Sequence, residues 1–172
     1  HRHVITRYDF FGIAVLSRIP LDSIETIASP PHGFPTLVAR ITLDNAPITL
    51  ISTHPMPPMT TLNYDARNTQ LASIAELVNG VRGARVLIGD LNTAMWGEHY
   101  RQLVDSTGLR NVREGFGTLP TWPTFMPFAM IPIDHCLVSE ELLASDVRLG
   151  TGIGSDHRPL VLTLQLTPAM AP

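Results

Sequence analysis

Residues 85–92 read Arg85-Val86-Leu87-Ile88-Gly89-Asp90-Leu91-Asn92, an apolar run with a polar ending. A short, continuous apolar run is typical of a strand buried within a layered fold. A carboxylate just past such a strand is well placed at the mouth of a site above the sheet, whereas within the strand it would be costly to bury. The stretch therefore predicts a buried central strand with polar side chains at its end.

Further strands and two helices are predicted on either side of this strand. Period-two alternation over residues 37–43, a turn at 44–47 and a second run at 48–53 predict a hairpin. Helical spacing predicts one helix that is capped by Asn63 or Asp65 and stopped at Asn79-Gly80, and a second over residues 98–106 that ends at Gly108. Other strands are expected at residues 12–17, 133–138 and 160–166, with a long Pro-rich loop over 115–132. Because strands outnumber helices, we expect a layered α/β or α+β sandwich with much antiparallel pairing.

The composition narrows the class of protein. The 172 residues carry a net charge of −3, and all 12 basic residues are Arg. This balance disfavours a protein that holds nucleic acid mainly by backbone charge, because such proteins carry a basic face. The one cysteine, Cys136, cannot form an internal disulfide, and no apolar run is long enough to span a membrane. We therefore expect one soluble domain over residues 1–172. A start at His1 without Met indicates a piece of a longer protein.

Four predicted strand ends carry clusters of polar residues. They are Ser52-Thr53-His54, Gly89-Asp90-Leu91-Asn92, Asp134-His135 and Ser155-Asp156-His157. Carboxylates, an amide and imidazoles together suit a hard cation with acid–base groups. The sequence lacks the Cys/His spacing of a structural zinc site, a Gly-rich phosphate loop and a G-x-S-x-G elbow, which argues against those classes.

Each cluster also has a structural interpretation. Asp90 and Asn92 fit an Asx turn or a helix cap, and His54 fits a turn before a Pro-rich loop. Residues 155–159 fit a plain turn, although four adjacent polar residues before an apolar strand favour a site. Trp96 and Trp122 suit either stacking on a ligand or the core, and for Trp96 we favour the core.

The order of these clusters resembles the endonuclease/exonuclease/phosphatase superfamily, the deoxyribonuclease I-like phosphohydrolases. The motifs of the resemblance, from Thr53-His54 to Ser155-Asp156-His157-Arg158-Pro159-Leu160, cover nearly the whole chain. It implies a four-layer α/β/β/α sandwich of mixed, largely antiparallel sheets. Shorter motifs are similar to a bacterial subgroup whose domain follows transmembrane helices, which implies a membrane-anchored parent on an unknown side of the membrane. These motifs are Thr53-His54-Pro55-Met56-Pro57-Pro58, Asp90-Leu91-Asn92-Thr93, Thr107-Gly108-Leu109-Arg110, Gly115-Phe116-Gly117 and Pro120-Thr121-Trp122-Pro123.

The resemblance implies phosphoester hydrolysis assisted by Mg²⁺ or Mn²⁺, with a role for each matched residue. Asp90 would orient or deprotonate water, Asn92 would fix that water or a phosphate oxygen, and both would lie at the metal with Asp156. His157 would donate to the charge that develops on phosphorus, held in orientation by Asp134. His54 would contact phosphate or protonate the leaving group. Arg158 and Trp122 would contact substrate.

One departure from the family pattern concerns the metal site. The family's principal metal ligand is a Glu on an early strand, preceded by an Asn on the first strand, and the only carboxylate among the first eleven residues here is Asp9. We therefore expect the N-terminal strands of the sandwich to be missing. Two alternatives follow: a catalytically inactive binding or structural remnant, or a chain that self-associates through an exposed sheet edge. The substrate stays open among a lipid head group, a small phosphodiester and nucleic acid.

Overall fold

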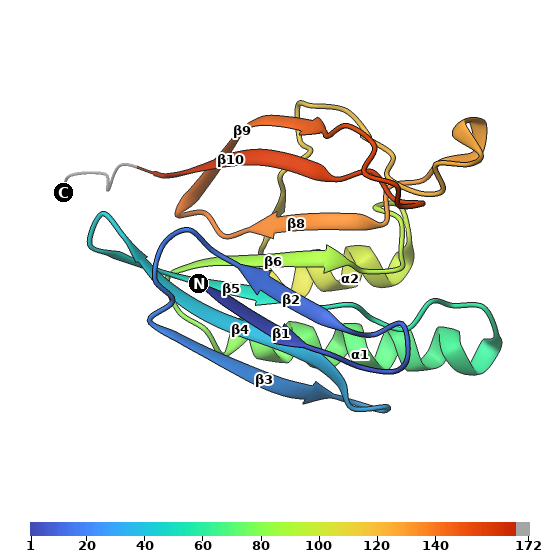
Figure 1. The fold of residues 1–172 in the computed structure, drawn as a ribbon, viewed down its shortest axis with the longest axis horizontal. Coiled ribbons are helices and arrows are strands. Elements are labelled where there is room, and N and C mark those ends of the chain that lie inside the picture. The colour runs from blue at the N-terminus through green and yellow to red at the C-terminus, as the bar shows by residue number, and fades with distance from the viewer. Residues whose placement is uncertain (168–172) are drawn as a thin grey trace.

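The computed structural model describes residues 1–167, and its largest element is a sheet in the order β3-β4-β5-β6-β8-β7 (Figure 1). These six strands are β3 (Ser23–Ser29), β4 (Phe34–Leu43), β5 (Ala46–Ser52), β6 (Ala84–Asp90), β7 (Arg110–Asn111) and β8 (Asp134–Val138). Neighbouring strands are antiparallel except for β5 and β6, which run parallel. The parallel pair is joined by a helix, as parallel strands require a long crossover. The predicted mixed, largely antiparallel α/β architecture is confirmed.

The two α-helices and two β-hairpins complete the layers. The helices are α1 (Thr61–Asn79) and α2 (Glu98–Thr107), and the hairpins pair β1 (Arg2–Ile5) with β2 (Ile13–Leu16) and β9 (Leu142–Leu149) with β10 (Leu160–Leu166). Leu87 and Leu137 face the helices, whereas Val86 and Cys136 face the β9–β10 hairpin. Alternate residues of one strand thus pack into two hydrophobic cores, one on each face of the sheet. Within residues 1–167 both α-helices lie on one face of the six-stranded sheet, so this part of the chain does not form the second helical layer.

The predicted hairpin exists, but its turn is tighter than expected. Only Asp44 and Asn45 separate β4 from β5, and both have positive φ, at 50° and 64°. Asp and Asn tolerate this conformation, which suits two-residue hairpin turns. Pro47 therefore lies within β5, opposite Thr42, and not in the turn.

Both predicted helices are present, and their predicted ends are confirmed. The first helix runs to Asn79, with Gly80 as its C-cap, and the second ends at Gly108 in the left-handed conformation. The predicted caps Asn63 and Asp65 are wrong, because Thr60 is the N-cap and its hydroxyl accepts the N–H of Asn63 at 3.2 Å. A Thr hydroxyl can satisfy this otherwise unpaired donor.

Four strands were not predicted, namely β1, β3, β7 and β9. Strand β1 lies in the first residues of the chain, and strand β7 has only two residues. The other two mix polar and apolar residues without a clean alternation in their burial. Within the predicted loop 115–132, a 3-10 turn forms at Pro127–Ala129, and an isolated bridge joins Trp122 to Ile131. Among residues 1–167, no helix combines the length and the apolar character that crossing a membrane would require.

Candidate functional site

The pairing of three strands brings separate parts of the sequence to one edge of the sheet. In the β6–β8 register Asp90 lies opposite Asp134, at the end of one strand and the start of the other. Ser52, the last residue of β5, pairs with Ile88 of β6, so the segment that carries His54 leaves the sheet at the same edge. The β9–β10 loop brings His157 to this edge as well.

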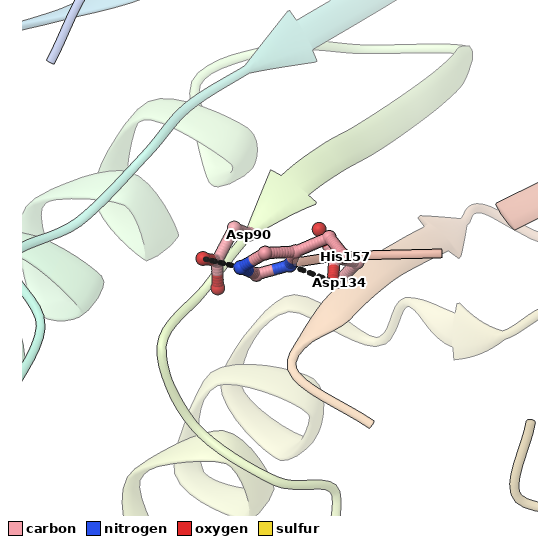
Figure 2. A group of neighbouring side chains, drawn as sticks. All are labelled: Asp90, Asp134 and His157. Atoms are coloured by element: carbon pink, nitrogen blue, oxygen red, sulfur yellow. Dashed lines mark hydrogen bonds and ion pairs between the residues drawn. The ribbon is translucent and has the colours of Figure 1, made fainter. Parts of the chain in front are cut away.

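Asp90, Asp134 and His157 form a compact group (Figure 2). The Nδ1 of His157 is 2.7 Å from the Oδ2 of Asp134, and its Nε2 is 3.8 Å from the Oδ2 of Asp90. The imidazole therefore lies between two carboxylates. A carboxylate on one ring nitrogen favours a proton there, which fixes the orientation of the ring. The other nitrogen faces Asp90.

His54 approaches the same carboxylate. Its Nε2 is 3.7 Å from the Oδ2 of Asp90, and its ring lies 5.2 Å from that of Phe11. Burial lowers the pKa of His54, and the nearby His157 lowers it further. Both effects favour the neutral form of this imidazole. Sequence reasoning missed Phe11, because nothing in its local pattern indicates contact with a residue so distant in the chain.

The carboxyl group of Asp90 is held in an unusual electrostatic environment. Burial raises its pKa to about 7, and the neighbouring Asp134 adds to this rise. The N–H of Asn92 donates to its Oδ1 at 2.8 Å, which acts in the opposite direction. A buried carboxylate beside a second one favours either a proton or a cation.

Asn92 is fixed by contacts on both its backbone and its side chain. It has a positive φ of 49°, and its N–H bond to Asp90 forms the predicted Asx turn. Its Nδ2 donates to the carbonyl of Pro55 at 2.9 Å, and its own carbonyl accepts from Arg67 Nη1 at 2.7 Å. The interpretation of this motif as an Asx turn therefore holds. The turn places the backbone N–H of Asn92 beside the Asp90 carboxylate.

The remaining predicted residues surround this group at its border. Asp156 is exposed, and its Oδ2 accepts a hydrogen bond from the indole Nε1 of Trp122 at 3.0 Å. The guanidinium of Arg158 donates to the carbonyl of Gly150. The Trp122 and His157 rings lie 6.3 Å apart. The expectation that Trp96 belongs to the core is wrong, because its side chain is 55% exposed.

Arg113 lies behind the site, and sequence reasoning did not identify it. It is only 3% exposed, and its Nη2 donates to the carbonyl of Asp134 at 2.6 Å. The same nitrogen lies 3.4 Å from the carbonyl of Leu119. Burial lowers the pKa of Arg113. A guanidinium that bonds backbone carbonyls in the interior fixes the strand start that carries Asp134, and no sequence motif marks it.

The donor set suits a divalent cation. One ligand atom from each of Asp90, Asp134 and His157 lies within 4.8 Å of the others. Carboxylate oxygens are the ligands that Mg²⁺ and Mn²⁺ prefer, and a cation would offset the raised pKa of Asp90. Asp9 pairs with Arg7 and accepts the N–H of Phe11, so its carboxylate serves the β1–β2 loop.

Comparisons with known proteins identify the family of this chain. The profile of the endonuclease/exonuclease/phosphatase family matches residues 1–157, and the chain belongs to this family. No curated protein sequence matches the chain.

Solved structures share the fold at low sequence identity. An endonuclease/exonuclease/phosphatase from Beutenbergia cavernae is 18% identical with a TM-score of 0.77, covering 92% of this chain and 48% of its own. A family protein from Leptotrichia buccalis is 16% identical with a TM-score of 0.76, covering 96% and 71%. Zebrafish (D. rerio) TDP2 in complex with a single-strand DNA product is 16% identical with a TM-score of 0.69, covering 84% and 68%. The chain thus spans about half of the first of these relatives.

Proposed function

We propose that this chain carries a phosphoesterase site in which Asp90, His157 and His54 act on a phosphoester with a divalent cation. The single observation that supports this function best is the contact between His157 and Asp134 at 2.7 Å, with the other ring nitrogen facing Asp90. Family membership supports the same class of reaction. We propose Mg²⁺ or Mn²⁺ as this cation.

The cation would be held by Asp90, with Asn92 and Asp156 as the further proposed ligands. Asp134 and His157 of the same group contact each other at 2.7 Å and would have other roles. When bound, a divalent cation polarises the phosphoryl group and stabilises the charge on the leaving oxygen. Mg²⁺ usually keeps several of its waters and takes only one or two carboxylates from the protein. A site with few carboxylates is compatible with that preference.

The chain's own residues have separable roles. The carboxylate of Asp90 orients or deprotonates the attacking water, since it lies in the middle of the group and faces both imidazoles. With a proton on each ring nitrogen, His157 donates from Nδ1 to Asp134, which holds the ring in place, and from Nε2 to the charge that develops on phosphorus. His54, whose pKa is lowered by burial, contacts a phosphate oxygen. Trp122 and Arg158 would contact the substrate, and the 6.3 Å between the ring centroids of Trp122 and His157 supports this role for Trp122.

An inactive binding module is the second candidate, and one observation favours it. Asp134 is engaged by His157, so Asp90 is the carboxylate of this group that faces two imidazoles and no cationic partner among residues 1–167. Fewer available carboxylates mean weaker compensation for the dehydration of a cation. This alternative predicts the same fold without turnover.

Hydrolysis of bis(p-nitrophenyl) phosphate separates the two candidates. The active site predicts turnover with Mn²⁺ that EDTA abolishes and that Asp90→Ala or His157→Ala lowers by about 10² to 10³. Asp105→Ala is the matched control, because this carboxylate is exposed on α2 away from the site. Equal metal-dependent turnover by wild type and both site variants would refute the assignment. Absence of turnover in the wild type would favour the inactive module.

A further inference from the structure

Large, exposed apolar side chains gather at one end of this protein. Among residues 1–167, nine large apolar side chains are more than half exposed. Except for Leu16, they lie on the loops around the site or in the first turn of α1. We call this set the apolar rim, and its members are Tyr8, Phe10, Met59, Leu62, Trp96, Phe125, Phe128 and Ile153. Single exposed apolar residues are ordinary on protein surfaces, but a gathered set marks an interaction surface.

The contacts between loops show that the rim surrounds the candidate site. Phe11, next to Phe10, packs against His54, so the β1–β2 loop reaches the site. The N–H of Thr124, next to Phe125, donates to the carbonyl of Asp156 at 2.9 Å.

The remaining rim residues come from three further connections. Met59 and Leu62 follow β5, Trp96 follows β6, and Ile153 belongs to the loop that carries His157. In Figure 1 these connections lie together on the right-hand side, where β6 ends.

The loop between Glu114 and Asp134 contributes two exposed aromatic residues, Phe125 and Phe128. It contains no charged residue over positions 115–133. Phe125 is 69% and Phe128 90% exposed, and the turn that carries them projects from the molecule in Figure 1. Removing apolar surface from water is the main favourable contribution to association. The two exposed phenyl rings would therefore stabilise a complex that buries them.

We propose that the apolar rim inserts into a zwitterionic lipid–water interface, and that the phosphoester acted on belongs to a lipid head group. The substrate class rests on the proposed function, whereas the docking surface does not. Aromatic and aliphatic tips on separate loops can each enter the head-group layer independently. Docking by this face brings the polar head groups to the edge that carries Asp90 and His157.

The charge of the chain supports a zwitterionic surface as the partner. The net charge is −3, and the charged side chains on or next to the rim segments are mixed in sign. They are Arg7, Arg67 and Arg158 against Asp9, Asp65, Glu98 and Asp156. An anionic membrane or a nucleic acid strand is bound by clustered basic side chains. Charges of both signs around the rim favour a partner surface that has no net charge, such as a zwitterionic membrane.

Vesicle sedimentation tests this inference without relying on activity. We expect the wild type to pellet with phosphatidylcholine vesicles, and the double variant Phe125→Ser/Phe128→Ser to bind at least about tenfold more weakly, since each phenyl ring loses its burial. Tyr8→Ser/Phe10→Ser, on a different loop, should weaken binding as well. Leu16→Ser is the matched control, because Leu16 is 74% exposed but lies at the far end of β2, and binding should not change.

Three results would overturn the inference. The first is no pelleting of the wild type, and the second is binding that requires phosphatidylserine. The third is binding of single-stranded DNA that the Phe125→Ser/Phe128→Ser variant loses while vesicle binding persists. Turnover of soluble bis(p-nitrophenyl) phosphate reports on the proposed function alone. Vesicle binding without such turnover would support the docking surface and refute the lipid phosphoester as substrate. Turnover without vesicle binding would support the phosphoesterase function and refute both the docking surface and the lipid substrate.

Discussion

The Nδ1 of His157 lies 2.7 Å from the Oδ2 of Asp134, which joins the start of β8 to the loop before β10. Because Asp134 is paired with Asp90 across the β6–β8 register, the same contact places the imidazole between two strands of one sheet edge. The orientation of His157 therefore depends on the strand register as well as on its own loop.

Asp134→Asn should lower hydrolysis by about 100-fold while the fold persists. An amide can donate to or accept from Nδ1, so it no longer selects one tautomer of His157. The measurement is the initial rate on bis(p-nitrophenyl) phosphate with Mn²⁺, with circular dichroism as the check on folding. Asp105→Asn, an exposed change on α2, should retain the wild-type rate. A full rate in Asp134→Asn would contradict an orienting role.

Asp90→Asn should stabilise the metal-free protein at high pH. The pKa of Asp90 rises from 3.8 to about 7 on folding, so the folded state binds this proton more tightly than the unfolded state. Its contribution to stability is complete below pH 4 and is lost as the pH rises through about 7. The neutral amide avoids this loss.

The measurement is the free energy of unfolding in EDTA at pH 5 and pH 8. The advantage of Asp90→Asn over wild type should grow between these values, by up to about 3 kcal/mol. An equal difference in the free energy of unfolding at both pH values would show that the surroundings of Asp90 do not raise the pKa of its carboxyl group.

Gly89→Ala should destabilise the protein by about 2 kcal/mol or more. A Cβ at Gly89 would lie 1.9 Å from the carbonyl oxygen of Thr53, and the residue has a positive φ of 149°. The clash would separate the ends of β5 and β6, and with them His54 and Asp90. Thermal unfolding measures the loss, and Gly152→Ala, where a Cβ meets nothing within 4 Å, is the control.

Arg113→Ala should cost about 2 kcal/mol or more, because it removes a charged donor from the partly buried carbonyl of Asp134. The start of β8 then loses its anchor, and hydrolysis should fall together with stability. Denaturant unfolding and the hydrolysis rate are the two measurements. Arg101→Ala on the exposed face of α2 should change neither. Wild-type stability in Arg113→Ala would show that this hydrogen bond is dispensable.

The local pattern of the sequence determined the central strand, the helix stops and the identity of the polar strand ends. The run before Asp90 is apolar enough to be buried in one conformation, and Gly80 and Gly108 end helices for reasons that lie within a few residues. The four polar clusters could be found because each follows or precedes an apolar run. Local chemistry is sufficient for such features.

Only the tertiary structure decided which polar residues meet. The β6–β8 register places Asp134 opposite Asp90, and the hydrogen bond from Trp122 leaves Asp156 at the border of the group. Arg113 could not have been predicted, since its role depends on a carbonyl that strand pairing brings near. The exposure of Trp96 and of the apolar rim likewise depends on how loops leave the sheet. Distances between strand ends follow from register and packing, which a single sequence does not encode locally.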